Sequence, residues 1–288
     1  MTKRDLLKQL PVFSRLIRTI DILRKENAVL QSTLHQLITV DVTAKSDRVA
    51  EASPFADGLP VPLPVLRHLV SWTEDHSVFF NLGRAGAAWL AEILKRYVHL
   101  PSGCPTRVLD FGCGCGRVLR HLRALPQVEL HGCDCNALAV QWCRNHLSFA
   151  RFRTNGFAPP LDFEDDRFDM IYACSVFTHL PEAAQHQWMA EFQRILAPEG
   201  VLVITTHGDR FFDRLSRPEQ ERYRRGELVM WQEAYPGANV CGAFHSGGYV
   251  RDVLARGFDL LESLPGGSLA TPPQDAYVLR NRPHSHSK

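Results

Sequence analysis

Residues 108–117, with the sequence VLDFGCGCGR, constrain the fold of this 288-residue chain more than any other stretch. An apolar run ends at Asp110, and glycines follow at positions 112, 114 and 116. From Val118 onward, apolar residues recur at helical spacing. We therefore expect a strand, a glycine-rich turn and a helix, because glycine adopts φ > 0 freely and lets a ligand approach the backbone. The free N–H groups at the start of the helix would suit an anion or a polar ligand.

The spacing of these glycines separates two kinds of nucleotide-binding protein. A dinucleotide-binding turn has the pattern Gly-x-Gly-x-x-Gly. Here Arg117 occupies the place of the third glycine, and the glycine falls at 116 instead. The pattern acid-x-Gly-x-Gly-x-Gly resembles the first motif of the class I S-adenosylmethionine-dependent methyltransferases. A nicotinamide-dependent oxidoreductase stays open as an alternative, with the position of the third glycine against it.

Composition and charge disfavour several classes of partner. The formal net charge is only +2, so no strong basic field points to nucleic acid. No apolar run approaches the roughly 20 residues of a membrane span. The N-terminus is basic but lacks an apolar signal core, so we expect a cytoplasmic protein without a membrane partner.

Four of the eight cysteines form two Cys-x-Cys pairs, Cys113 with Cys115 and Cys133 with Cys135. Each pair should follow one of two neighbouring strands. A metal site is the sharper hypothesis. The plainer one is a set of small side chains around a cofactor pocket in a reducing compartment. We favour the second and expect no metal, because the glycines and Asp134 already give these turns a function.

The N-terminal part predicts a helix followed by a linker and a cap. Over 3–38, apolar residues alternate by three and four, and Asn27 takes a core position. This pattern is typical of a parallel two-stranded coiled coil, so we expect residues 1–40 to form a homodimer. An amphipathic helix packed on its own domain is the alternative. A Pro-rich linker over 41–64 and a helical cap over 65–100 follow, with short helices expected around 64–71 and 83–97 and an aromatic connection over 72–80 between them.

Between residues 101 and 282, predicted strands alternate with helices, which indicates a parallel sheet with right-handed crossovers. The strands are expected at 107–111, 127–132, 149–153, 168–174, 200–206, 258–263 and 276–281, and the helices at 116–125, 137–146, 183–196 and 247–256. Residues 208–245 interrupt this alternation and are interpreted as a lid over the carboxyl edge of the sheet, where open α/β sheets bind ligands. The tail over 283–288 is expected to be disordered.

Four segments together resemble the ordered motifs of class I methyltransferases: 110–116, Asp134, 168–172 and 196–202. The resemblance implies an α/β fold, a doubly wound, seven-stranded, mostly parallel sheet with an antiparallel final strand, and S-adenosylmethionine as the cofactor. It also implies that the first motif holds the methionine part and that residues 155–156 contact adenine. An acid after the second strand is placed to accept hydrogen bonds from ribose. The expected cofactor-binding residues are Asp110, Gly112, Cys113, Gly114, Gly116, Asp134, Cys135, Asn155, Gly156 and Ser175.

Methyl transfer needs an acceptor held in line with the sulfonium methyl, and a hydroxyl acceptor gains from a histidine base. The candidates near strand ends are His179, His207 and His245. Segments 175–180 and 274–280 resemble small-molecule or glycan methyltransferases, and the Pro-Pro-aromatic turn of DNA-base methyltransferases is missing after the fourth strand. We therefore expect a methyltransferase acting on a hydroxyl, or secondarily an amine or carboxylate, of a small molecule or sugar. A cofactor-binding protein without turnover is a further alternative.

Overall fold

The computed structural model describes residues 57–71, 75–99, 103–231, 241–268 and 273–282. They all belong to the unit Ala52–Lys288. The predicted helix over 3–38, most of the linker and the tail over 283–288 lie outside the described residues, so these three remain predictions.

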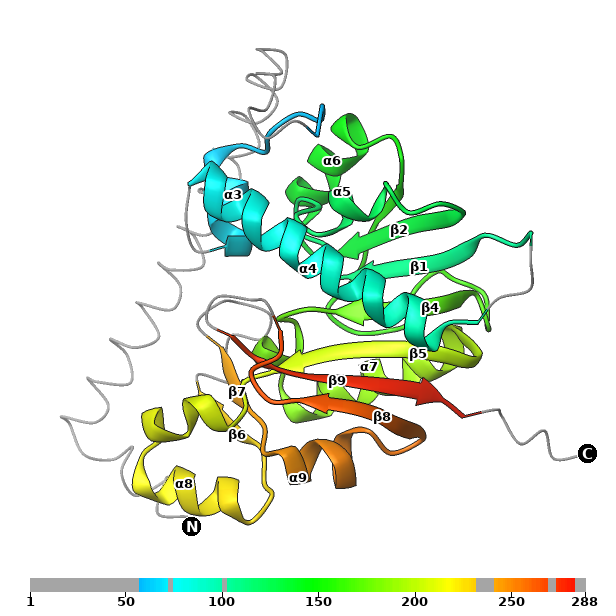
Figure 1. Cartoon of the computed structure of the whole chain (residues 1–288). Helices are drawn as coiled ribbons and strands as arrows, with labels where there is room; N and C mark the ends of the chain where they lie inside the picture. Colours follow the sequence, from blue (N-terminus) through cyan, green and yellow to red (C-terminus); the bar gives the residue numbers. More distant parts are fainter. Residues whose placement is uncertain (1–56, 72–74, 100–102, 232–240, 269–272, 283–288) are drawn as a thin grey trace, which may run out of the picture. The chain divides into compact units, whose positions relative to one another are not determined.

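Seven strands form one sheet in the order β3-β2-β1-β4-β5-β9-β8 (Figure 1). Strands β1 to β5 are parallel to one another, whereas β9 runs antiparallel to both β5 and β8. The strands are β1 (Thr106–Phe111), β2 (Val128–Asp134), β3 (Arg151–Thr154), β4 (Phe168–Ala173), β5 (Leu196–Thr206), β8 (Phe258–Leu264) and β9 (Asp275–Asn281). The predicted seven-stranded, mostly parallel sheet is confirmed, including its antiparallel final strand.

Alternate side chains of the central strands serve two different cores, because successive residues of a strand point to opposite faces of the sheet. In β1, Val108 packs in one core and Leu109 in the other. In β4, Met170 and Ile171 divide in the same way. All six residues of β4 are buried, as expected for a parallel strand that is covered on both faces.

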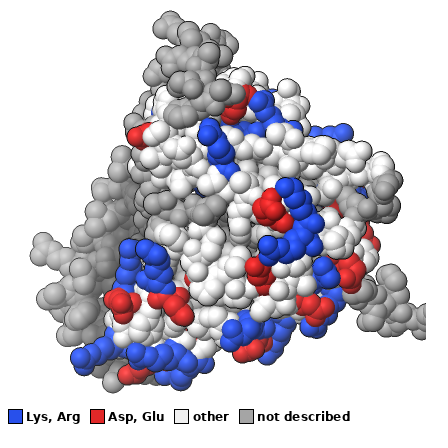
Figure 2. Space-filling view, viewed as in Figure 1, with Lys and Arg blue, Asp and Glu red and all other residues white. Residues whose placement is uncertain are grey.

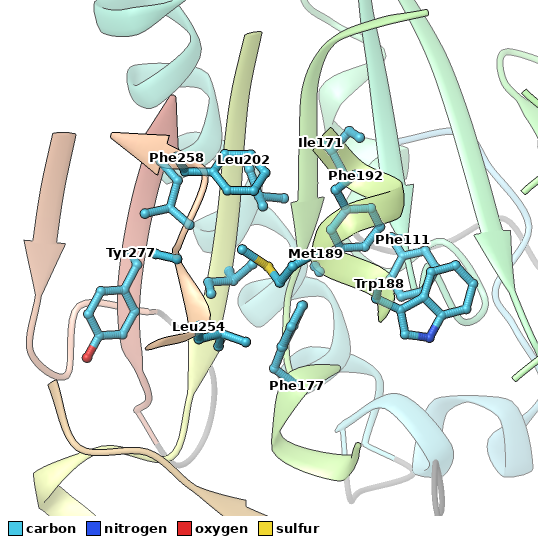
Figure 3. Close-up of a cluster of buried hydrophobic side chains, with 14 of the residues drawn as sticks. Phe111, Ile171, Phe177, Trp188, Met189, Phe192, Leu202, Leu254, Phe258 and Tyr277 are labelled. Carbon is cyan, nitrogen blue, oxygen red and sulfur yellow. The ribbon is translucent and has the colours of Figure 1, made fainter. Parts of the chain in front are cut away.

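Helices cover the two faces of the sheet. The core around Val108 includes residues of α3 (Pro64–Ser71), α4 (His76–Tyr97), α5 (Leu119–Leu122) and α6 (Ala137–His146). The opposite core includes α7 (Glu182–Ile195), α9 (Gly247–Tyr249) and the π-helix η3 (Val250–Leu254). In this second core, shown in Figure 3, the ring of Phe111 lies 4.5 Å from that of Trp188 and 4.9 Å from that of Phe192. Each such buried side chain contributes about 1.5–3 kcal/mol, which fixes α7 against the end of β1.

Helix α4 starts earlier than the sequence pattern predicts. It begins at His76 rather than at 83, because the Asp75 carboxylate caps its first turn by accepting hydrogen bonds from two backbone N–H groups. The aromatic segment that was expected to connect two helices therefore opens α4. Phe79 and Phe80 are fully buried in the core around Val108.

Two later helices are also corrected. The helix expected over 116–125 shortens to the four residues of α5, since the residues before it take turn geometry after the glycines. The helix expected over 247–256 divides into α9 and the π-helical η3. Helix α6 agrees with its expected bounds because the Asn136 side chain caps it by accepting hydrogen bonds from Leu138 and Ala139.

Arg120 of α5 holds residues 57–60, which precede α3, against the core. Its side chain is fully buried, with Nε 2.6 Å and Nη2 3.1 Å from the two carboxylate oxygens of Asp57. The guanidinium also donates to the carbonyls of Leu59 (3.2 Å) and Pro60 (3.1 Å) and lies 4.6 Å from the centre of the Phe80 ring. Burial raises the pKa of Asp57, but the hydrogen bonds from Arg120 and the Leu59 N–H outweigh it and hold the pKa below its ordinary value.

The residues expected to form a lid fold into a small unit beyond β5. It contains η2 (Asp209–Arg214), α8 (Arg217–Arg224), β6 (Val229–Trp231) and β7 (Gly242–Phe244), with β6 and β7 paired antiparallel. Its own cluster includes Phe211, Tyr223 and Phe244. A bridge between His207 and Phe244 joins this unit to the end of β5, and the His245 N–H donates to the His207 carbonyl (2.8 Å).

Charges of opposite sign lie interspersed on the face shown in Figure 2. On and after α8, Arg222 and Arg225 both pair with Glu227, at 3.0 and 2.7 Å. Such a surface lacks the single-signed field that steers nucleic acid. Within the described ranges, every helix is too short or too polar to cross a bilayer.

Candidate cofactor and acceptor site

The glycine-rich turn after β1 has the geometry that its sequence predicts. Gly112, Gly114 and Gly116 take φ values of 79°, 52° and 74°, a region that favours glycine. The space around the turn also requires glycine at two of these positions. A Cβ at Gly112 would lie 2.4 Å from Val176, and one at Gly114 would lie 2.3 Å from Val70 of α3. The turn is therefore closely covered by α3 and by Val176, which lies three residues after the end of β4.

Asp134 joins this turn to the end of β2. One carboxylate oxygen accepts from the Gly114 N–H and the other from the Asn136 N–H, both at 2.7 Å. The N–H groups of Gly112 and Cys113 donate to the Cys133 carbonyl at 2.8 and 3.0 Å. Burial raises the pKa of Asp134, while the N–H groups of Asn136 and Gly114 favour its charged form. Because each carboxylate oxygen has a second lone pair, Asp134 can still accept hydrogen bonds from ribose hydroxyls.

Asp110, the last acid of β1, is buried between the neighbouring strands. Its register partners are Gly132 of β2 and Tyr172 of β4. Burial raises the pKa of Asp110 to about 7, although Tyr172 and the charge of Arg117 lower it in part. A cation placed beside this carboxyl would favour its ionised form, and the amino group of a bound methionine is such a cation.

Asn155 follows β3 and lies next to Asp134. Its N–H donates to the Asp134 carbonyl (3.1 Å), and its side-chain amide donates to the Gly156 carbonyl (2.7 Å). The side-chain oxygen of Asn155 is buried and has no hydrogen-bond partner. Since buried acceptors are normally satisfied, this oxygen fits a ligand donor such as the exocyclic amine of adenine.

Ser175, just after β4, has a strained backbone and bonds to two residues that sequence reasoning missed, Thr205 and Gln274. Ser175 takes φ 60°, which is uncommon outside glycine. Its N–H donates to the Thr205 hydroxyl (2.7 Å), and its hydroxyl donates to the Gln274 side-chain oxygen (3.1 Å). The Thr205 hydroxyl donates to the same oxygen (2.6 Å). Gln274 stood in a segment used for the family resemblance, but nothing in the sequence linked it to Ser175.

Two of the three candidate bases lie close together. The ring centres of His179 and His207 are 6.3 Å apart. His179 donates through Nδ1 to the Cys241 carbonyl (2.7 Å), so its lone pair is on Nε2. The ring of His207 packs between Phe211 (4.3 Å) and Phe244 (5.3 Å). Burial and the neighbouring His179 lower the pKa of His207 to about 4, and burial also lowers that of His179.

His245, the last residue of the segment 208–245, is fully buried and faces Gln185 of α7. Its Nε2 is 2.8 Å from the Gln185 side-chain oxygen. The Gln185 amide nitrogen already donates to the carbonyls of Phe177 (3.2 Å) and Leu180 (2.8 Å), so Nε2 of His245 must carry the hydrogen. Burial lowers its pKa to about 3. A base must contact the acceptor, and this closed position offers no such contact.

The paired cysteines do not converge. Cys113, Cys115 and Cys133 are buried, whereas Cys135 is exposed. Across the described part of the chain, no group of three or more His, Cys, Asp or Glu side chains could hold a metal ion. The Cys143 thiol points at the Gly114 carbonyl, 3.5 Å away. Small thiols therefore pack around the glycine turn, which is the plainer of the two hypotheses.

Comparison with known proteins agrees with this geometry. Residues 108–200 match the family model of a methyltransferase domain. A malonyl-[acyl-carrier protein] O-methyltransferase of Bacillus cytotoxicus is 26% identical over 169 residues, or 53% of this chain and 54% of that protein. A sterol 24-C-methyltransferase of Schizosaccharomyces pombe is 31% identical over 141 residues, or 46% and 36%. The chain thus spans about half or less of the length of these curated relatives.

A solved S-adenosylmethionine-dependent methyltransferase from Mesorhizobium loti shares the fold. It aligns with a TM-score of 0.50 at 17% identity and covers 68% of this chain and 98% of that one. The sheet order and this likeness together show a Rossmann-like methyltransferase fold. Over residues 108–200 the chain is similar to a methyltransferase domain, which implies S-adenosylmethionine as the cofactor.

Proposed function

We propose that the protein transfers a methyl group from S-adenosylmethionine to a hydroxyl of a small molecule or sugar. One observation carries the cofactor half of this proposal: the Asp134 carboxylate binds the Gly114 N–H at 2.7 Å, with the unpaired Asn155 oxygen beside it. Together they offer acceptors for ribose and for adenine on adjacent strands. When bound, the cofactor supplies an electrophilic methyl group on a sulfonium.

The acceptor half rests on His179. Its Nδ1–H is held by the Cys241 carbonyl, which fixes the tautomer and leaves Nε2 free to take a proton. His207, with a pKa of about 4, is neutral at pH 7 but a weak base, and a base works best when its pKa lies near the working pH. We therefore assign proton removal to His179 and packing beside it to His207. The names of the relatives give O- and C-methylation, so the hydroxyl assignment depends on this histidine.

Calorimetry with S-adenosylhomocysteine tests the cofactor half. Asn155→Ala should weaken binding severalfold, because the adenine amine loses its acceptor, whereas Asp162→Ala on the exposed surface should not. No binding by the wild-type protein, together with binding of a reduced nicotinamide, would reverse the assignment in favour of an oxidoreductase.

Turnover with labelled S-adenosylmethionine across a panel of hydroxylated metabolites tests the acceptor half. His179→Gln should lower kcat by about 10²–10⁴-fold and leave the affinity for S-adenosylhomocysteine intact. His186→Gln, on the exposed face of α7, is the matched control. Full activity in His179→Gln would remove the base, and binding without turnover on any acceptor would favour a non-catalytic protein.

We also retain the homodimer through residues 1–40 and the cytoplasmic location as proposals that rest on sequence pattern. Light scattering of the full chain and of a chain lacking residues 1–40 tests the first. A halved mass after deletion is expected, and an unchanged mass would reject the coiled coil.

A further inference from the structure

Arg117 is a largely buried cation that lacks a partner among the described residues. It follows the glycine turn directly, and its Nε is closed to solvent without a hydrogen-bond partner. Neither a hydrogen bond nor an ion pair reaches its guanidinium within the described ranges. An arginine stays charged in a protein, and an uncompensated charge in a protein interior is strongly destabilising. The position therefore calls for an anion from outside the described residues.

Other arginines with little exposure are paired. Arg120 lies 2.6 Å from Asp57, Arg194 lies 2.6 Å from Glu191, and Arg107 lies 3.2 Å from Asp169. Burial lowers the pKa of Arg117, and the charge of Asp110 acts in the opposite direction. No ion pair joins these two side chains in the part of the chain that the structure describes. Among the described residues, each of these three guanidiniums has a carboxylate partner and Arg117 has none.

Arg117 also lines a small, half-open pocket. The other lining residues are Leu82, Gly86, Trp89, Val118, Cys174, Thr205 and Ser268. Those from α4 form an apolar wall that includes Trp89, and the lining contains no carboxylate. The Ser268 oxygen accepts from the Gln274 N–H (2.9 Å), which leaves the hydroxyl hydrogen available to a ligand. The pocket therefore combines one cation, one neutral donor and an apolar surface.

We propose that this pocket binds a carboxylate through Arg117, and that the acceptor of the methyl group is therefore an organic acid. A planar carboxylate accepts two parallel hydrogen bonds from a guanidinium, Ser268 adds a third donor, and Trp89 contacts the carbon skeleton. The pocket adjoins the glycine turn at Arg117 and the ends of β4 and β5 at Cys174 and Thr205. This inference rests on the proposed function. The cofactor's own methionine carboxylate is the second source of the same chemistry.

Calorimetry on the full chain distinguishes the two sources. The probes are S-adenosylhomocysteine, 5′-methylthioadenosine, which lacks the amino-acid part, and benzoate added to protein saturated with S-adenosylhomocysteine. Arg117→Gln is compared with the wild type and with Arg84→Gln, an exposed arginine of the same α4 that carries Trp89. Loss of a charged hydrogen-bonding group is expected to weaken carboxylate binding about ten- to a hundredfold.

Weaker benzoate binding in Arg117→Gln alone, with unchanged S-adenosylhomocysteine affinity, supports an acidic acceptor. Weaker S-adenosylhomocysteine binding with unchanged methylthioadenosine affinity supports carboxylate binding by Arg117 but assigns the carboxylate to the cofactor. Equal losses for both nucleosides, or no change for any probe, overturn the proposal. If Arg117→Gln does not fold, Arg117→Lys, which keeps the charge but loses the planar guanidinium, is measured with the same probes and compared with the wild type in the same way. A wild-type protein that binds neither nucleoside refutes the proposed function instead, and benzoate added without nucleoside then tests Arg117 by the same comparison.

Discussion

Replacing Asp57 with alanine should destabilise the folded chain by about 3 kcal/mol. The substitution leaves the fully buried Arg120 guanidinium without its carboxylate, which held it at 2.6 and 3.1 Å. Removing one partner of a buried ion pair costs about 3–5 kcal/mol. The lower end applies here because the Asp57 side chain retains 12% exposure and the Leu59 and Pro60 carbonyls still accept from Arg120. At about 2–4 °C per kcal/mol for a domain of this size, Tm should fall by about 6–12 °C.

Urea unfolding followed by circular dichroism measures this change. The control is Glu92→Ala, which breaks the 2.8 Å pair with Lys95, whose two side chains are 66% and 64% exposed. That pair should contribute less than about 1 kcal/mol. Adding Arg120→Met to Asp57→Ala should recover part of the loss, because no charge then remains buried. An Asp57→Ala protein as stable as the Glu92→Ala control would refute the reasoning, and with it the role of Arg120 in holding the chain ahead of α3.

Three further outcomes can be measured. Gly114→Ala should lower the free energy of unfolding by about 1–3 kcal/mol in urea, since its Cβ would lie 2.3 Å from Val70, whereas Gly58→Ala has open space and should lose less. The pKa of Asp110 is about 7 when folded and 3.8 ordinarily, so the folded state binds the extra proton and stability should fall as pH rises through this window. Urea midpoints of Asp110→Asn should lack that fall, and an equal slope in both proteins would contradict the assignment. Because the ionised Asp110 carboxylate would attract the ammonium group of the ligand, S-adenosylhomocysteine should bind more tightly above pH 7 than below it in calorimetry.

Local patterns in the sequence predicted most of the sheet and the position of the glycine turn. Strand bounds agree within a few residues because the central strands are short apolar runs. The glycines at 112, 114 and 116 likewise indicate a turn with positive φ. Helix α6 was predicted correctly because its capping residue, Asn136, directly precedes it. Helix α4 was not, because its start depends on the Asp75 cap and on the burial of Phe79 and Phe80 against the sheet.

The functional details that the sequence missed are set by tertiary contacts. His245 has the same local setting as the other candidate bases, and only the folded structure shows that it is fully buried. That Arg117 has no carboxylate partner among the described residues is likewise visible only in the folded structure, since the sequence does not show which acids lie near it. Ser175, Thr205 and Gln274 meet because β4, β5 and β9 are neighbours in the sheet.

The bond between Asp134 and Gly114 has a consequence for how tightly a nucleoside can be held. One carboxylate shapes the turn and, in the proposed function, also accepts hydrogen bonds from the ribose, so the binding surface is formed before the ligand arrives. Little ordering entropy is then lost on association, and the free energy of contact goes into affinity. Substitution of Asp134 should therefore lower both the stability of the protein and its affinity for the nucleoside. An acid that only contacted the ligand would change the affinity alone.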